Sequence, residues 1–191
     1  MLAAGWSRRM GGVDKRLLCV GGVPLVRRSV ALYRALGLPV IVVGREGDAA
    51  LRAALEGMEV RLLANPDPAA EQGASARIGL AACALGGAGV MLALADQPVL
   101  SEADLRWLIG RFAEEGGRRI AIARHDGMRG NPVILPKALA LALRAAPWGM
   151  APRRFIDDHA GDIVWCDTPS PGFTTDIDTP EDAARWGFYE A

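Results

Sequence analysis

The sequence lacks the features that mark several classes of protein. Lysine plus arginine and aspartate plus glutamate number 22 each, so the formal net charge is zero and no basic field indicates nucleic acid or a membrane surface as a partner. The three cysteines, Cys19, Cys83 and Cys166, are too far apart for a CxxC pair or a zinc knuckle. Three reduced thiols in a cytoplasmic protein therefore fit better than a disulfide framework.

Long apolar segments and nucleophilic motifs are missing as well. Glycine, proline or charge interrupts every hydrophobic stretch of membrane-spanning length, and the apolar stretch before the first arginines is too short for a secretory signal. The two histidines, His125 and His159, are isolated, and no Ser–His–Asp or Cys–His arrangement is evident. We expect a cytoplasmic protein that does not use a covalent nucleophile.

Short apolar runs alternate with segments of helical period, and the length favours one domain, residues 1–191. Several runs are apolar at consecutive positions, as a strand covered on both faces requires. The predicted strands are 39–44, 60–65, 89–96, 119–124, 132–135 and 162–167. The predicted helices are 25–36, 101–112 with Ser101 as N-cap, and 137–146. This alternation predicts an α/β fold with a largely parallel, doubly covered sheet, in which ligands bind at the carboxyl ends of the strands.

The first loop at such a strand end is AAGWSRRMGGVDK. Its glycines, Gly5, Gly11 and Gly12, let main-chain N–H groups approach a ligand. A hydroxyl and several cations in the same loop suit an oxygen-rich polyanion such as a nucleoside triphosphate. These residues are Ser7, Arg8, Arg9, Lys15 and Arg16. The glycine spacing matches neither a Walker A loop nor GxGxxG, so a flexible arm with solvated arginines is the alternative.

Only Met1 precedes the LAAG segment of this loop. Strands usually run about 5–6 residues. We therefore expect either a genuinely abbreviated first strand or a chain that continues upstream of Met1.

The second loop, LADQP, follows the most hydrophobic predicted strand. Asp96 stands at the end of that strand, where a carboxylate is costly unless it is paired or binds a cation. Magnesium accepts one or two carboxylates and takes its other ligands from phosphates and water. The alternative is an aspartate that simply begins the turn into the next helix.

The third loop is TTDIDTPEDA. Thr179 as N-cap, Pro180 and the following acids form a complete helix start, which needs no function. Asp176 and Asp178 are not explained by that start, because they alternate around Ile177 as on an extended segment. The two carboxylates are therefore candidates to bind a cation together with Asp96.

Two smaller motifs add candidates. Gly73 and Ser75 precede a helix in EQGASARIGL, where N–H groups and a hydroxyl suit a base or phosphate, with simple capping as the alternative. Gly130 and Asn131 are expected in a turn before the 132–135 strand. There Asn131 either orients a substrate or shapes the turn.

Four motifs resemble, in order, those of MobA-like NTP transferases: LAAGWSRRMGGVDKRLL, LADQP, GNPVIL and DIDTPEDA. The molybdenum-cofactor cytidylyltransferase branch is the most similar. LAAG stands where the guanylyl branch usually has LAGG, and QGASARIGL replaces its GPLxG segment. The chain departs from the cytidylyl branch at Asn131, where His is common, at GGVDK, and at WGMAPRRFI, which replaces a GDxGAR-like segment on the acceptor side.

The resemblance implies a Rossmann-like three-layer α/β sandwich with a mostly parallel central sheet, as in nucleotide-diphospho-sugar transferases. The implied reaction is Mg²⁺-dependent transfer of CMP from CTP to the phosphate of molybdopterin, with release of pyrophosphate. A molybdoenzyme that receives the product is an implied partner. The alternatives are a GTP- or UTP-dependent transferase acting on another phosphorylated acceptor, and a non-catalytic nucleotide-binding protein that delivers cofactor.

Site residues carry over from the resemblance by position. The implied catalytic residues are Arg9 and Lys15, which hold the phosphates, and Asp96, which binds magnesium. Asp178 is the implied second metal ligand, with Asp176 as the alternative. The implied nucleotide-binding residues are Leu2, Ala3, Ala4, Gly5, Trp6, Ser7, Lys15, Asn65, Gly73 and Ser75.

Overall fold

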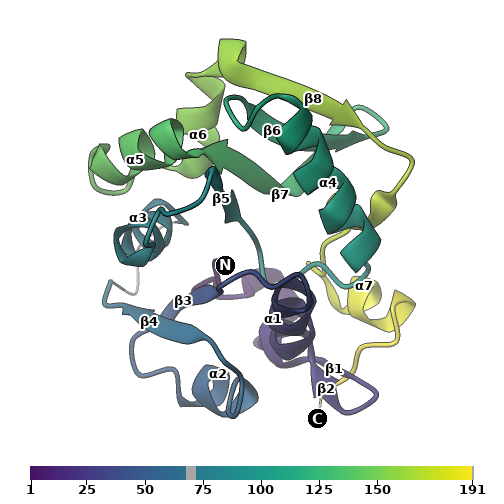
Figure 1. Cartoon of the computed structure of the whole chain (residues 1–191). Helices are drawn as coiled ribbons and strands as arrows, with labels where there is room; N and C mark the ends of the chain where they lie inside the picture. The colour runs from purple at the N-terminus through teal and green to yellow at the C-terminus, as the bar shows by residue number, and fades with distance from the viewer. Residues whose placement is uncertain (68–71, 191) are drawn as a thin grey trace.

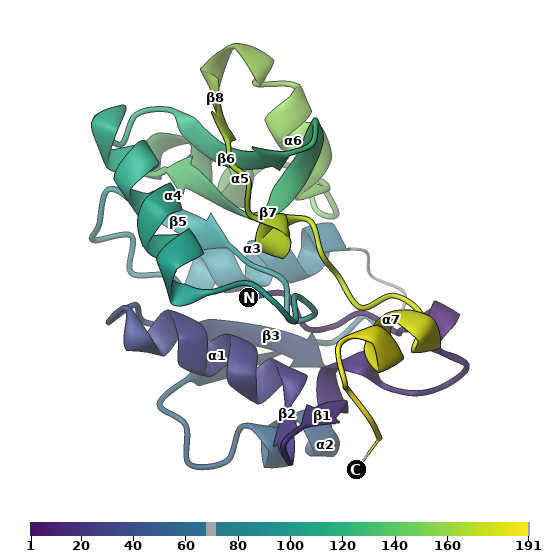
Figure 2. The same cartoon turned by 90° about the vertical axis from the view of Figure 1, so that its right-hand side faces the viewer.

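The computed structural model describes residues 1–67 and 72–190, without the side chain of Arg8, and it has an α/β architecture (Figures 1 and 2). One sheet consists of the parallel strands β3 (Ile41–Arg45) and β4 (Arg61–Asn65). A second sheet has the order β5 (Gly89–Leu92), β7 (Met128–Pro136), β6 (Ile120–His125) and β8 (Ile163–Asp167). A small antiparallel hairpin consists of β1 (Cys19–Val20) and β2 (Val23–Pro24).

The N-terminal residues lie between the two larger sheets. Leu2 forms parallel bridges to Val43 on one side and to Leu94 on the other. The Leu2 amide donates to the Ala93 carbonyl at 2.8 Å, and the Ala3 amide donates to the Val43 carbonyl at 2.9 Å. The expected first strand is therefore present as a short bridging segment. It places the loop after Ala3 at the carboxyl ends of its neighbours.

The four-stranded sheet is mixed, and the prediction of a mostly parallel sheet is wrong there. β7 runs antiparallel to both β5 and β6, while β6 and β8 are parallel. The cause is an Asp126–Gly127 turn, in which both residues have positive φ, 48° and 76°. Asp-Gly turns of this kind join hairpin strands tightly. Gly130 and Asn131, predicted in a turn, lie inside β7 instead.

The predicted helices are confirmed with small shifts of their ends. The helices of the described residues are α1 (Leu25–Ala35), α2 (Ala49–Ala54), α3 (Gln72–Ala82), α4 (Glu102–Glu114), α5 (Lys137–Ala145), α6 (Pro152–Asp157) and α7 (Pro180–Arg185). Short 3-10 turns are η1 (Arg8–Met10), η2 (Lys15–Leu17), η3 (Ala160–Asp162) and η4 (Pro171–Phe173). Ser101 and Thr179 each close a capping box at the start of α4 and α7. Across the described ranges, no helix combines the length and apolar character needed to cross a membrane.

Residues Gly73 and Ser75, expected before a helix, lie within the first turn of α3. The helix is rich in alanine and glycine, so its two faces differ little in polarity and its periodicity is weak. Short helices α2 and α6 have too few turns to show a clear period. The sequence pattern therefore placed the start of α3 too late and missed α2 and α6.

The consecutive apolar residues of β6 are buried on both faces of the four-stranded sheet, as predicted, whereas β5 is only half-buried. Ile120 and Ile122 of β6 pack in a core cluster with residues of α5 and α6. Ala121 and Ala123 pack in a different cluster with residues of α4. Figure 1 shows α5 and α6 on one side of this sheet and α4 on the other. Alternate side chains of one strand therefore enter different cores.

Candidate functional site

A cavity of about 620 Å³ lies at the end of the N-terminal bridging segment. Most of the predicted site residues line it. These are Leu2, Ala3, Ala4, Gly5, Trp6, Ser7, Arg9, Lys15, Ser75, Asp96 and Asp178. Arg16, Gln72, Leu94, Ala95, Ala151 and Arg153 complete its lining. The cavity thus lies among the carboxyl ends of adjacent strands, where the sequence analysis expected a ligand.

Left-handed backbone positions and the buried side chain of Met10 determine the shape of the loop from Ala4 to Asp14. Ser7, Gly11 and Gly12 all have positive φ, and the Ser7 hydroxyl accepts a hydrogen bond from the Lys15 amide at 3.3 Å. Met10 is buried in a cluster that includes Ile177. The loop is therefore folded back on itself, and Lys15 leaves it in a fixed direction.

A cluster of charged side chains, which we call the site cluster, lies in the cavity. Lys15 Nζ is 2.6 Å from Asp96 Oδ2 and 2.9 Å from Asp178 Oδ1. Arg9 Nη2 is 2.7 Å from Asp178 Oδ2. Ile177 fixes this arrangement, because its side chain is buried and its amide donates to the Asp96 carbonyl at 2.9 Å. We include Asp176 in the site cluster because the charges of Asp96, Asp178 and Lys15 act on it, although it does not line the cavity itself.

The site cluster leaves some of its acidic atoms without a partner. Asp96 Oδ1 and Asp176 Oδ1 are buried and accept no hydrogen bond. Burial, together with the negative charges of Asp96 and Asp178, raises the pKa of Asp176 to about 7. Burial alone would lower the pKa of Lys15, but the contacts with Asp96 and Asp178 outweigh it and raise that pKa. Lys15 therefore stays protonated, and some carboxylate oxygens around it still lack a hydrogen-bond partner.

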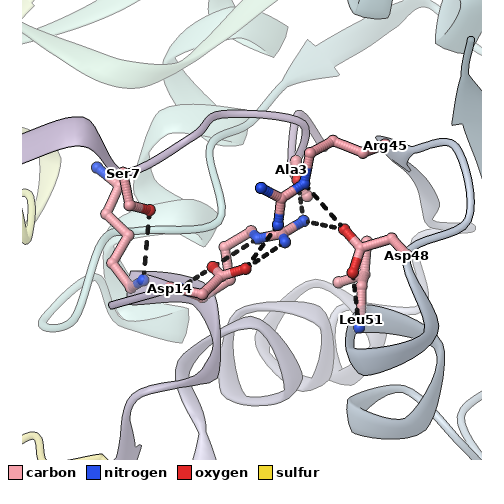
Figure 3. A network of polar contacts seen from close by, with 8 residues as sticks. Ala3, Ser7, Asp14, Arg45, Asp48 and Leu51 are labelled. Atoms are coloured by element: carbon pink, nitrogen blue, oxygen red, sulfur yellow. Dashed lines mark hydrogen bonds and ion pairs between the residues drawn. The ribbon is translucent and has the colours of Figure 1, made fainter. Parts of the chain in front are cut away.

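A second set of ion pairs, the buried network, lies behind the loop (Figure 3). The Arg16 side chain is only 3% exposed, and its guanidinium pairs with Asp14 and, at 2.8 Å, with Asp48. It also donates to the carbonyl of Ala3. Arg45 completes the buried network, with Nη2 2.7 Å from Asp14 Oδ2 and Nε 3.3 Å from Asp48 Oδ2. The carbonyl of Ala3 and the side chain of Asp14, at the two ends of the loop, therefore share one cation.

The acids of the buried network are held in the ionised form. Burial raises the pKa of Asp14, but hydrogen bonds and the charge of Arg16, with a smaller contribution from Arg45, lower it below its usual value. The same balance lowers the pKa of Asp48, which also accepts a hydrogen bond from the Leu51 amide at 3.0 Å. Asp48 is thus the N-cap of α2, and the buried network joins that helix to the loop.

Trp6 connects the buried network to the cavity. The Arg45 guanidinium lies 4.5 Å from the centroid of the Trp6 ring, within the range of a cation–π interaction. The indole lines the cavity and is half exposed, at 52%. An aromatic surface thus stands at the cavity, fixed by a cation that is itself held by Asp14 and Asp48.

Two predicted nucleotide-binding residues do not line the cavity. Asn65 is buried, and its Nδ2 donates to Ser75 Oγ at 3.0 Å, so it supports a residue that does line the cavity. Gly73 faces the backbone after α5: a Cβ atom there would lie 2.4 Å from the Gly149 carbonyl oxygen and 2.6 Å from that of Met150. Its missing side chain therefore permits a close main-chain approach.

Asn131 also lies outside the cavity lining. Its main-chain carbonyl accepts a hydrogen bond from Gln97 Nε2 at 2.9 Å. The same amide nitrogen lies 3.0 Å from the Phe173 carbonyl. Gln97, which follows Asp96, is buried, so these contacts hold the strand end that carries Asp96.

The donor set fits a hard divalent cation that shares its ligands with a substrate. Asp96 and Asp178 both contact Lys15, and Asp96 keeps a buried carboxylate oxygen without a partner. Among the described residues, no group of three or more His, Cys, Asp or Glu side chains is arranged as a closed metal site. Magnesium suits two carboxylates, because it takes its remaining ligands from water and phosphate.

Gln72 and Arg153 also line the cavity but belong to none of the motifs from which site residues were predicted. They lie at the starts of α3 and α6 and not at the ends of strands. Arg16 was predicted only as one of several cations, and its burial could not be read from the sequence.

Comparison with known proteins gives one family and several similar structures. A model of the MobA-like NTP transferase domain matches residues 1–163. Rv0371c from Mycobacterium tuberculosis H37Rv is 25% identical with a TM-score of 0.76, over 96% of this chain and 94% of that one. A nucleotidyl transferase from Methanothermobacter thermautotroptrophicus is 25% identical with a TM-score of 0.75, over 96% and 92% of the two chains.

Two further structures are less identical in sequence and therefore bear on the fold alone. Rv0371c in complex with manganese matches at 24% identity and a TM-score of 0.71, over 97% of this chain and 94% of that one. Molybdopterin-guanine dinucleotide biosynthesis protein A from Archaeoglobus fulgidus matches at 18% identity and a TM-score of 0.67, over 97% and 94% of the two chains. These likenesses extend over almost the whole chain.

Proposed function

The chain belongs to the MobA-like NTP transferase family, and from this premise we propose that it transfers CMP from CTP to the phosphate of molybdopterin, releasing pyrophosphate. The observation that carries the proposal is the site cluster in the cavity, with Lys15 between Asp96 and Asp178. We also propose that the α/β fold has the layers of a Rossmann-like three-layer sandwich.

Binding of the nucleotide is assigned to the loop and its neighbours. Residues Leu2 to Ser7 line the cavity, and the positive φ of Ser7 turns the loop so that its amides are directed toward bound oxygen atoms. Ser75, held by Asn65, extends this surface. The methyl group of Ala4 narrows the space for a base and favours a pyrimidine, so CTP is expected to bind more tightly than GTP.

Charge neutralisation is the main chemical task. An oxygen of the acceptor phosphate attacks the α-phosphorus in line, one P–O bond forms, and the bond to the β-phosphate oxygen breaks as pyrophosphate leaves. Arg9 and Lys15 are assigned to the phosphates, where they stabilise the accumulated negative charge. The acceptor phosphate is already ionised near neutral pH, so no general base is required.

Asp96 and Asp178 are assigned as the residues that hold Mg²⁺. When bound, the cation polarises the phosphoryl oxygens and orients the triphosphate. The partnerless oxygen of Asp96 and the raised pKa of Asp176 support a site that gains stability from an added cation. The manganese complex of the similar Rv0371c structure is consistent with a divalent metal.

A pyrophosphate-release assay tests the proposal. The purified protein is incubated with magnesium and each of CTP, GTP, UTP and ATP, with and without molybdenum cofactor. We expect cofactor-dependent release with CTP. Release with GTP alone would overturn the cytidylyl assignment, and binding of nucleotide without release under any combination would contradict an enzymatic function.

A further inference from the structure

A second cavity, of about 780 Å³, lies on the amino-terminal side of Leu2. It is distinct from the cavity that contains the site cluster, and Leu2 lines both. Most of its lining side chains are apolar, and they come mainly from the ends of α1 and α3 and from β3 and β5. The proposed transfer reaction makes no use of this second cavity.

Two open strand edges face the second cavity. Within the described part of the chain, β4 is the only strand that pairs with β3, and β7 is the only strand that pairs with β5. Residues of both open edges line the cavity, among them Ile41 of β3 and Met91 of β5. An open edge presents main-chain N–H and C=O groups that a further strand can pair with.

The pairing of Leu2 shows which occupant fits between these edges. Leu2 forms parallel bridges to Val43 and to Leu94, so the two edges are one strand apart at that level. Both views place the N-terminus between β3 and β5 (Figures 1 and 2). All four residues of β5, Gly89–Leu92, line the second cavity beyond Leu2. An extended peptide of about that length, parallel to β3, therefore meets both edges.

Two buried polar groups at the second cavity favour a peptide over a purely apolar ligand. The α-amino group of Met1 donates to the Ile41 carbonyl at 2.7 Å, and burial lowers its pKa to about 6. The Tyr33 hydroxyl is buried and has no hydrogen-bond partner among the described residues. A peptide that ends in a carboxylate beside Met1 complements the charge of the amine, and its main chain carries acceptors and donors for a hydroxyl.

We infer that the second cavity binds the extended, apolar C-terminal segment of a partner protein, which adds a strand between β3 and β5 and ends in a carboxylate beside Met1. Apolar side chains suit both faces of this strand, because Tyr33 of α1 and Leu80 of α3 both line the cavity. Figure 1 shows these two helices on opposite sides of the N-terminus. Since Leu2 also lines the nucleotide cavity, the docked strand abuts one wall of that cavity.

Protection of Cys83 from a thiol reagent tests this inference without any turnover. Cys83 lines the second cavity and is half-buried, whereas Cys19 and Cys166 are buried. The probe is the synthetic peptide acetyl-Lys-Lys-Val-Ala-Val-Ile-Val with a free C-terminal carboxyl group. At saturating peptide we expect labelling of Cys83 to slow by about 10-fold or more. The control Cys83→Ser should lose this labelling and should bind the fluorescently tagged peptide as the wild type does.

Three further peptides separate strand pairing from other kinds of occupancy. N-methylation of alternate amides should weaken binding by about 10-fold or more, because it removes hydrogen bonds to the strand edges and keeps the side chains. A C-terminal amide should also bind more weakly than the free carboxylate. Equal binding of the N-methylated peptide would assign the cavity to an apolar ligand without strand pairing. If the free peptide leaves Cys83 unprotected while the same sequence joined to Met1 raises the free energy of unfolding, the inference of a separate partner is wrong.

Discussion

The site cluster and the buried network lie close to each other at the same loop, yet they differ in what is left unsatisfied. In the buried network, Asp14 and Asp48 are each contacted by both Arg16 and Arg45. In the site cluster, three aspartates face two cations, Arg9 and Lys15. One oxygen each of Asp96 and Asp176 therefore has no hydrogen-bond partner. The complete pairing in the buried network stabilises one fixed arrangement of side chains. The incomplete pairing in the site cluster leaves carboxylate oxygens that an added cation would stabilise.

The largest expected effect is the loss of turnover when one carboxylate of the site cluster is removed. Asp96→Asn removes the carboxylate charge that contacts Lys15 and that we propose to hold Mg²⁺, and we expect turnover to fall about 1,000-fold or more. Its free energy of unfolding should not fall, because the change also relieves repulsion with Asp176 and Asp178. Pyrophosphate release and urea denaturation measure the two quantities. Asp158→Asn, on the exposed end of α6, is the control, and retained activity in Asp96→Asn would remove this residue from the metal site.

The next largest effect breaks the buried network. Arg16→Met leaves Asp14 and Asp48 with one cation between them and the Ala3 carbonyl without its donor. We expect a loss of about 3–5 kcal/mol in the free energy of unfolding, measured by urea denaturation. The matched change Arg106→Met removes an exposed pair with Glu102 and should cost less than about 0.5 kcal/mol. Equal effects of the two changes would show that burial does not distinguish the pairs.

An intermediate effect depends on pH. The pKa of Asp176 is raised to about 7 in the folded protein, above its value in the unfolded chain. The folded state therefore binds this proton more tightly between about pH 4 and pH 7, and ionisation costs stability as pH rises through that window. We expect Asp176→Asn to raise the free energy of unfolding at pH 8 without metal by up to about 4 kcal/mol, because each pKa unit between the unfolded and folded values is worth about 1.4 kcal/mol, and to leave it unchanged at pH 4. A constant difference across this range would contradict the raised pKa.

The smallest effect concerns the exposed edge of the site cluster. The side chain of Arg9 is 71% exposed and that of Asp178 is 34% exposed. Water and salt screen such a pair, so Arg9→Ala should change the free energy of unfolding by less than about 0.5 kcal/mol at any salt concentration. Thermal denaturation at low and high salt measures it. A loss as large as that of Arg16→Met would show that the two clusters do not differ in kind.

The site cluster was accessible from the sequence because its residues follow predictable elements. Lys15 ends the loop after the N-terminal segment, Asp96 follows the segment that pairs with Leu2, and Asp178 precedes the capping box of α7. Parallel strands bring such strand ends and their loops together. The buried network was not accessible in this way. It depends on contact between Asp14–Arg16 and Arg45–Asp48, segments about 30 residues apart that show no charge pattern of their own.

The direction of β7 was predicted wrongly because of one local turn. The Asp126–Gly127 turn lies between apolar runs that the sequence analysis separated at Gly130 and Asn131 instead. Because the turn was placed four residues too late, the β6–β7 hairpin was not predicted, and a parallel connection was predicted in its place. The consecutive burial of β6 was predicted correctly, because it depends only on cover from both faces.

The approach of Gly73 to the main chain at Gly149 has an evolutionary consequence. Backbone atoms, not side chains, set the spacing between α3 and the segment that leads into α6. Substitutions at the cavity-lining residues Ala151 and Arg153 therefore change the side chains at the cavity while this spacing stays the same. A lineage can thus vary one wall of the cavity without moving the helices that frame it.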